Sequence, residues 1–280
     1  MKLNLVPART GAAWVRSGLK TFWQQPLAFI SLFFLFMAAI SMVSVLPIIG
    51  SVIAPVLLPF MTLGLMVATS VAHENSNPDA LIRATRPGDL QRPTGSAMFF
   101  EVFGAMRAEW RSLVVLGVIS AVYFVFAVMV TALVDGGQLM RAYLLDDAIS
   151  PEVMASSDFQ LARVLLMCLN LPLSLAMWHA PALVHWHRVE PVKSIFFSIV
   201  ALFRNFGAYA LFVLSWFGVF LLAGIAMGLV ATVLVGVGAL GAGGAAVAVG
   251  NILMIGTALV LAAMSLSSTW FTFRDSFDPN

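Results

Sequence analysis

Sulfur and imidazole side chains, which bind soft metals such as copper and zinc, gather between residues 167 and 187. They are Met167, Cys168, Met177, His179, His185 and His187. On one helix Cys168 and His179 share a face, but the helical rise separates them by about 16 Å, so one ion cannot touch both. His185 and His187 point to opposed faces of such a helix. We expect these residues to pack at the membrane interface beside the neighbouring tryptophans, and metal binding is the weaker alternative.

Carboxylates concentrate in the segment 135–159, where a hard cation could be held. They are Asp135, Asp146, Asp147, Glu152 and Asp158. Their spacing does not match a calcium-binding loop. The single cysteine, Cys168, excludes an intramolecular disulfide and any multi-cysteine metal motif. The sequence therefore predicts no catalytic residue, no metal ligand, no cofactor-binding residue and no cofactor.

Intramembrane reaction and ion pathways leave recognisable residues, and the sequence lacks them. It contains no H-E-x-x-H, G-x-S-x-G or P-loop motif and no paired intramembrane aspartates. An ionisable side chain at bilayer depth would mark a proton or ion pathway. Only the fourth apolar stretch offers polar candidates, Asn170 and His179. A proton-coupled transporter and a nucleotide-driven pump are disfavoured, and nothing supports an intramembrane enzyme.

Prolines interrupt two apolar stretches, with Pro55 and Pro59 in the second and Pro172 and Pro181 in the fourth. Broken membrane helices can expose carbonyl groups to a substrate. More often such prolines are tolerated as kinks, and we favour the kink here because few polar residues accompany them.

Small residues recur every fourth position in the fifth apolar stretch. They are Gly224, Gly228, Thr232 and Gly236. Such a stripe lets another helix approach closely. We expect the sixth stretch to occupy it, and another subunit is the alternative.

The elements that carry these residues follow from composition. Of the 280 residues, 61% are apolar and only 10% are charged, against about a quarter charged in soluble domains. About 20 apolar residues cross a bilayer as a helix. The predicted spans are 27–46, 52–72, 113–134, 160–182, 207–235 and 246–270. The sequence therefore predicts an all-α, polytopic transmembrane bundle in one integral-membrane domain, 1–280.

Basic residues lie almost entirely on one side of these spans. Thirteen of the 15 Lys and Arg fall in the N-terminal segment, the 73–111 and 183–206 loops and the C-terminal tail, whereas Arg141 and Arg163 do not. The positive-inside rule then places both termini in the cytoplasm and the 135–159 loop outside. This location also argues against nucleic acid as a partner, despite the pI near 9.0.

Three amphipathic segments precede the first, third and fifth spans. Their apolar stripes begin at Trp14, Met98 and Ile195 and share one spacing, i, i+1, i+4, i+5, i+8, which is one helix face. We expect interfacial helices whose apolar faces enter the cytoplasmic leaflet while Lys and Arg meet anionic headgroups. Each is followed by two spans, which suggests a three-fold repeat over 6–72, 94–182 and 190–270.

Two motifs resemble a known family. One is V-P-A-R-x-G-x-x-W-V-R-x-G-L-x-x-F-x-x-x-P from Val6 to Pro26. The other is A-P-A-L-V-x-x-H from Ala180 to His187, followed by Pro191, Ser194, Ser198 and Arg204-Asn205. The chain resembles, over its whole length, a family of multi-span inner-membrane proteins of proteobacteria that has no established activity. The resemblance implies a bacterial inner-membrane location and carries over no site residues.

Two functions fit these features. The first is a non-enzymatic scaffold or assembly partner in the bilayer, contacting lipid headgroups and other membrane proteins or itself. The alternative is a transporter or channel for a small or lipid-like molecule that uses the proline-broken second and fourth spans. The alternative predicts a polar cavity at bilayer depth near Pro55, Pro172 and Asn170.

Overall fold

The structure is a computed structural model that describes residues 2–46, 49–75, 95–145, 147–236 and 244–277. Within these ranges six helices are long and apolar enough to cross a membrane. They are α2 (Pro26–Ser44), α3 (Ile49–Glu74), α6 (Trp110–Asp135), α9 (Ser157–Met177) continued by α10 (Ala180–His187), α12 (Phe206–Gly236) and α13 (Gly244–Ser276). No strand forms in the described ranges beyond an isolated bridge between Leu3 and Phe277. The predicted all-α bundle of six spans is confirmed.

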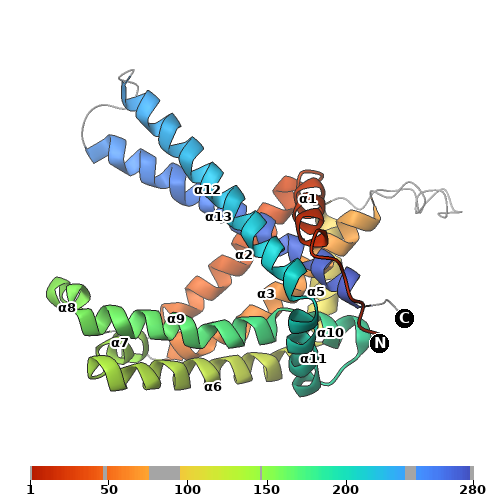
Figure 1. Cartoon of the computed structure of the whole chain (residues 1–280), viewed down its shortest axis with the longest axis horizontal. Coiled ribbons are helices and arrows are strands. Elements are labelled where there is room, and N and C mark those ends of the chain that lie inside the picture. The colour runs from red at the N-terminus through yellow and green to blue at the C-terminus, as the bar shows by residue number, and fades with distance from the viewer. Residues whose placement is uncertain (1, 47–48, 76–94, 146, 237–243, 278–280) are drawn as a thin grey trace, which may run out of the picture.

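Shorter helices lie at the two ends of the bundle. The helices α1 (Thr10–Phe22), α5 (Gly95–Ala108) and α11 (Pro191–Arg204) precede α2, α6 and α12, which confirms the three helices predicted before spans one, three and five. Figure 1 shows them beside α10 and both chain termini, at what we name the terminal end. The opposite, far end holds α7 (Gln138–Met140), η1 (Arg141–Leu145) and α8 (Pro151–Ala155). The three-fold repeat stays a prediction, because a shared element order does not make the units superimpose.

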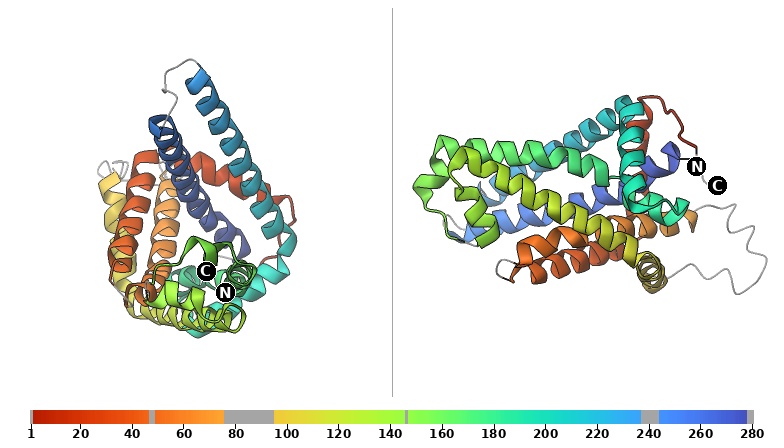
Figure 2. Two further views of the ribbon diagram at one scale, coloured as in Figure 1. Left: turned by 90° about the vertical axis from the view of Figure 1, so that its left-hand side faces the viewer. Right: turned by 90° about the horizontal axis from the view of Figure 1, so that it is seen from below.

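The spans are arranged in pairs that meet at the terminal end and diverge toward the far end. Helix α6 packs against α3 on one side and against α9 on the other, whereas the α12–α13 pair leans away from them (Figures 1 and 2). No described side chain between 217 and 236 or between 248 and 262 is buried. Within the described chain, the far halves of α12 and α13 therefore contribute no buried side chain, and only their inner residues, such as Val219 and Leu259, pack against the core.

The small-residue stripe of α12 lies in this free region, so our expectation that α13 fills it is wrong. A Cβ atom added to Gly224, Gly228 or Gly236 would meet no atom of the described residues within 4 Å. Close backbone approach occurs elsewhere. A Cβ on Gly11 would collide with the main chain of Ala208, and one on Gly18 with Ser268. Helix α1 thus packs tightly between α12 and α13.

Buried tryptophans attach the other helices to the last turns of α13. The Trp216 indole N–H donates to Ser268 Oγ at 3.0 Å, and the Trp14 indole donates to Asp275 Oδ2 at 2.8 Å. The bilayer core holds no water to accept these N–H groups, so an internal acceptor is needed. The polar segment 265–276 of α13 supplies these acceptors at the centre of the terminal end.

The amphipathic helices bury different faces from those we expected. Trp14, Val15 and Phe22 of α1 are buried inside the protein, not in lipid. In α11 the buried residues include Ser194 and Ser198. The Ser198 hydroxyl donates to the Leu175 carbonyl at 3.1 Å and accepts from the His179 N–H at 3.0 Å, which holds this polar face against the end of α9. Phe196 and Phe203 of α11 are exposed, whereas the rest of its predicted stripe is half-buried. In α1 and α5, by contrast, Trp14 and Met98 at the start of the stripe are buried, so α11 comes nearest to the exposed apolar face of an interfacial helix.

The fourth span is broken, and not where its first proline lies. Pro172 is inside α9, which continues to Met177. The chain then turns at Trp178 and His179, and Pro181 lies in the first turn of α10. In the first turn of a helix the backbone N–H groups have no acceptor within the helix, so the missing N–H of a proline costs no hydrogen bond. The predicted single helix over 160–182 is therefore two helices.

Candidate functional site

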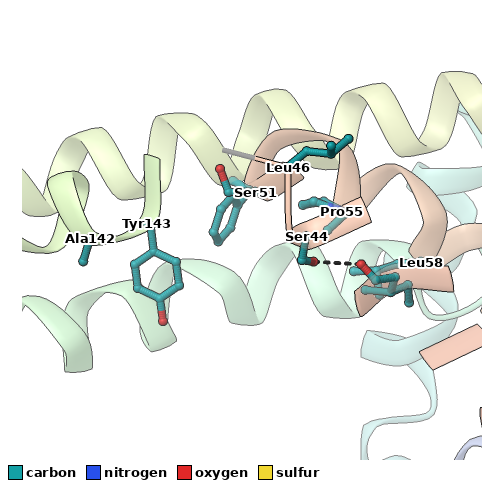
Figure 3. Close-up of a pocket in the computed structure, with 10 residues that line it drawn as sticks. Ser44, Leu46, Ser51, Pro55, Leu58, Ala142 and Tyr143 are labelled. Atoms are coloured by element: carbon teal, nitrogen blue, oxygen red, sulfur yellow. Dashed lines mark hydrogen bonds between the residues drawn. The ribbon is translucent and has the colours of Figure 1, made fainter. Parts of the chain in front are cut away.

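A cavity of ≈ 390 Å³ opens at the far end between the α2–α3 hairpin, α6 and η1 (Figure 3). It is lined by Ile40, Ser44, Leu46, Ser51, Ala54, Pro55, Leu58, Phe124, Ala142 and Tyr143. Figure 3 shows Ala142 and Tyr143 on one side of the view and Ser44, Pro55 and Leu58 on the other. The Tyr143 ring packs edge-on against Phe124, with ring centroids 6.0 Å apart. The short π-helix η1 thus forms the mouth of the cavity.

A second cavity, of ≈ 250 Å³, lies next to the first between α3, α6 and α9. It is lined by Pro55, Leu58, Pro59, Thr62, Ser120, Phe124, Asn170, Leu173, Ser174 and Met177. Both cavities share Pro55, Leu58 and Phe124. We name the two together the far-end crevice.

The far-end crevice reaches about halfway along α3. Counted along α3 from Ile49, Pro55 lies about 9 Å deep and Thr62 about 20 Å deep, at 1.5 Å per residue. Half of the hydrocarbon core is about 15 Å. The deeper cavity is therefore at the depth that we expected for a transport site near Pro55 and Asn170. Pro172 does not line it.

Hydrogen-bond acceptors line the deeper cavity. The hydroxyls of Thr62, Ser120 and Ser174 each donate to the carbonyl four residues earlier, at 3.1, 3.0 and 2.9 Å. Their protons are thus used within their own helices, while their oxygens can still accept. The Asn170 amide N–H donates to the Leu166 carbonyl at 2.8 Å, which leaves Oδ1 as an acceptor.

The prolines of α3 add backbone acceptors. Pro59 has no N–H to donate to the carbonyl of Pro55, and both residues line the cavity. None of the described residues that line the far-end crevice carries a charge. The site can therefore receive hydrogen bonds from a bound molecule without offering it an ionic partner.

The sulfur and imidazole residues of the fourth span do not come together. Cys168 is exposed, and Met167 is 72% exposed on the outer surface of α9. His179 is fully buried, with Nε2 at 3.1 Å from Thr272 Oγ1 and 3.2 Å from the Tyr209 hydroxyl. His179 therefore packs inside the protein, and the expected packing at the membrane interface is wrong for this residue.

The other two histidines also lie apart. His185 Nδ1 is 3.9 Å from Glu109 Oε1. The His187 ring instead packs near Phe273 and Phe277, with centroids 5.8 and 6.1 Å apart. Across the described residues no three His, Cys, Asp or Glu side chains are grouped to hold a metal ion.

Two carboxylates of the acidic segment at the far end, Asp135 and Asp158, make hydrogen bonds to residues close to them in the chain. The Asp135 carboxylate accepts the backbone N–H groups of Gly137 and Leu139 at 2.9 and 2.7 Å. Asp158 accepts a hydrogen bond from the Ser157 hydroxyl at 3.1 Å. Asp146 lies outside the described residues.

Sequence reasoning missed the contributions of α6 and η1 to the crevice. Ser120 and Phe124 come from α6, and Tyr143 comes from η1. The one available signal was Ser120, a polar residue at the centre of an apolar span. Nothing in the sequence pairs it with Pro59 or Asn170.

Comparisons with known proteins place the chain in a family. No protein-family model and no solved structure matches it. A probable inner membrane protein of Burkholderia thailandensis is 33% identical over 279 residues, covering 99% of this chain and 94% of the relative. A match of this extent, together with six apolar spans, shows that the chain belongs to the same family of multi-pass inner-membrane proteins as that relative.

Proposed function

We propose that this protein is a transporter for an uncharged, hydroxyl-bearing, lipid-like molecule, which it binds in the far-end crevice. One observation carries the proposal: two adjacent cavities, which share the lining residues Pro55, Leu58 and Phe124, lie one beyond the other from the far end to about halfway along α3. A solid bundle would offer a substrate no such path. The proposal includes the orientation that the basic residues predict, with the far end facing the periplasm.

The lining of the crevice supports this ligand class. Several of its polar atoms, in Thr62, Ser120 and Asn170, are oxygens that can accept hydrogen bonds, and its described lining has no Lys, Arg, Asp or Glu. A phosphate would be desolvated there without a cation, which is strongly unfavourable. A headgroup with several hydroxyls would satisfy the acceptors of Thr62, Ser120 and Asn170.

The crevice also communicates with lipid. Leu58 lines both cavities and is 44% exposed on the surface of α3. A lipid-like molecule could therefore keep its chains in the bilayer while its headgroup enters between α3 and α6. This geometry suits an amphiphile better than a water-soluble solute.

Photocrosslinking tests the proposal. The full chain is placed in liposomes with a photoreactive glucosyl diacylglycerol or with a phosphatidylglycerol of identical chains. We expect the glycolipid to label the Pro55–Thr62 region of α3 several-fold more strongly. Ser120→Trp, which fills the deeper cavity, should abolish this preference, whereas Val122→Trp, on the exposed face of α6, should preserve it. Equal labelling by both lipids, unaffected by Ser120→Trp, would refute the proposed ligand.

Transport is tested separately from binding. Liposomes carrying the protein and a fluorescent glucosyl diacylglycerol should lose outer-leaflet signal faster than protein-free liposomes, and Ser120→Trp should slow this loss to the protein-free rate. If the glycolipid labels the protein but does not cross the bilayer faster than in protein-free liposomes, the protein binds the lipid without transporting it, and the proposed transport is refuted.

A scaffold is the second candidate, and the free α12–α13 pair favours it. The far halves of both helices have no buried residue in the described ranges, so a membrane partner could cover them. Stable co-purification of a defined membrane protein after mild detergent extraction, lost on Gly228→Leu, would support the scaffold. Repeated isolation of the chain alone would count against it.

A further inference from the structure

A separate groove of ≈ 420 Å³ lies at the terminal end between α11, α12 and the end of α9. Its lining is apolar and aromatic and includes Trp178, Leu202, Phe203, Phe206 and Leu214. It shares no lining residue with the far-end crevice. The two sites are therefore independent.

The groove has the position of the upper part of a lipid chain that begins at the membrane surface. It starts beside α11, whose Phe196 and Phe203 are exposed as on an interfacial helix. It follows α12 from Phe206 to Leu214, which is about 12 Å of helix at 1.5 Å per residue. An acyl chain that enters at headgroup level would run along this path into the hydrocarbon.

A cation is the sequence neighbour of residues that line the groove. Arg204 lies in sequence between the groove residues Phe203 and Phe206, is exposed, and forms no ion pair with any described carboxylate. A Cβ on Gly207 would be 3.3 Å from that of Ala8, so the exposed Arg9 that follows Ala8 adds a second cation to this corner. At the other end of α11, by contrast, Lys193 is paired with Glu190 at 2.9 Å.

We propose that this groove binds one acyl chain of an anionic phospholipid, with the lipid phosphate at Arg204. The apolar lining favours an acyl chain over a polar ligand, and the unpaired guanidinium of Arg204 favours a negatively charged headgroup. The same bilayer thus supplies an anionic lipid to the terminal end and an uncharged amphiphile to the crevice.

Native mass spectrometry of the detergent-purified full chain tests the site. The probes are phosphatidylglycerol and phosphatidylethanolamine with identical chains. We expect the wild type to retain phosphatidylglycerol preferentially. Arg204→Gln should lower this retention about five-fold, the usual contribution of one cation near an anionic lipid. Lys193→Gln, on the same helix but already paired, is the matched control and should change it little.

A groove-filling variant separates the chain from the headgroup. Ala210→Trp, in the lining of the groove, should reduce retention of both lipids while far-UV circular dichroism stays that of the wild type. Equal retention of the two lipids by the wild type would overturn the proposal. So would an effect of Arg204→Gln without any effect of a folded Ala210→Trp, because that result would reduce the site to surface charge. Neither outcome bears on the far-end crevice.

Discussion

The ion pair between Glu109 and Arg188 offers the sharpest test of how the terminal end is held together. Arg188 ends α10 in a left-handed conformation with φ 53°, and its guanidinium donates to Glu109 Oε1. The two side chains differ in environment, since that of Arg188 is 73% exposed and that of Glu109 is 9% exposed. Removing the arginine therefore strands a buried carboxylate, whereas removing the carboxylate leaves a cation in water.

This asymmetry sets the expected magnitudes. An exposed pair contributes about 0–1 kcal/mol, and deletion of one member of a fully buried pair costs about 3–5 kcal/mol. Arg188→Ala should fall between, at about 2 kcal/mol, because water still reaches one side. Glu109→Gln keeps an acceptor for Arg188 and removes the buried charge, so it should cost less than about 1 kcal/mol.

A glycine at the same position separates charge from backbone strain. Arg188→Gly loses the same ion pair, but glycine adopts a positive φ without the cost of about 1 kcal/mol that other residues incur. We expect it to be about 1 kcal/mol more stable than Arg188→Ala. Equilibrium unfolding in mixed micelles with increasing sodium dodecyl sulfate, followed by circular dichroism, measures these free energies.

Lys193→Gln provides the control, because its pair with Glu190 is exposed on both sides, at 67% and 72%. It should change the free energy of unfolding by less than about 0.5 kcal/mol. If Arg188→Ala were no worse than Lys193→Gln, or if Glu109→Gln were the most damaging variant, the account of a buried carboxylate would be refuted.

The remaining predictions concern packing, a buried hydroxyl and the crevice. Gly117→Leu should lower the free energy of unfolding by several kcal/mol, since its Cβ would overlap the main chain of α3, whereas Gly228→Leu should leave monomer stability unchanged in the same detergent titration. Tyr209→Phe should cost about 1 kcal/mol, the scale of a hydrogen bond between membrane helices, because its hydroxyl lies 2.8 Å from Ser276 Oγ; no loss would show that the bond is energetically neutral. In a Cys168→Ser background, Thr62→Cys should react with a water-soluble thiol reagent at least about ten-fold faster than Val122→Cys, and equal rates would mean that the crevice is closed.

Sequence patterns predicted the elements well because each pattern is local. A run of about 20 apolar residues specifies a span whatever its neighbours are, so all six were found, and α1, α5 and α11 followed from their amphipathic stripes. The break at Trp178 and His179 was missed because Pro172 and Pro181 were both interpreted as kinks within one helix. A proline is tolerated inside a membrane helix, and the chain turned where α10 could begin with Pro181 in its first turn.

Side-chain roles were harder to predict because they depend on partners far away in the chain. His179 looked like an interfacial or metal-binding residue, and only the arrival of Tyr209 and Thr272 makes it a buried hydrogen-bonding residue. The stripe at Gly224 and Gly228 was predicted to pack against α13, but the far halves of α12 and α13 diverge from the rest of the bundle.

By itself, the amino-acid sequence determined that this is a helical protein of the membrane, with its cations gathered beside one set of span ends. Both properties are sums over neighbouring residues and need no knowledge of packing. The tertiary structure alone decided that Pro55, Ser120 and Asn170 line one crevice, and that a second groove opens beside Arg204. These sites arise where helices fail to fill the space between them, and that depends on the shapes of side chains brought together from distant parts of the chain.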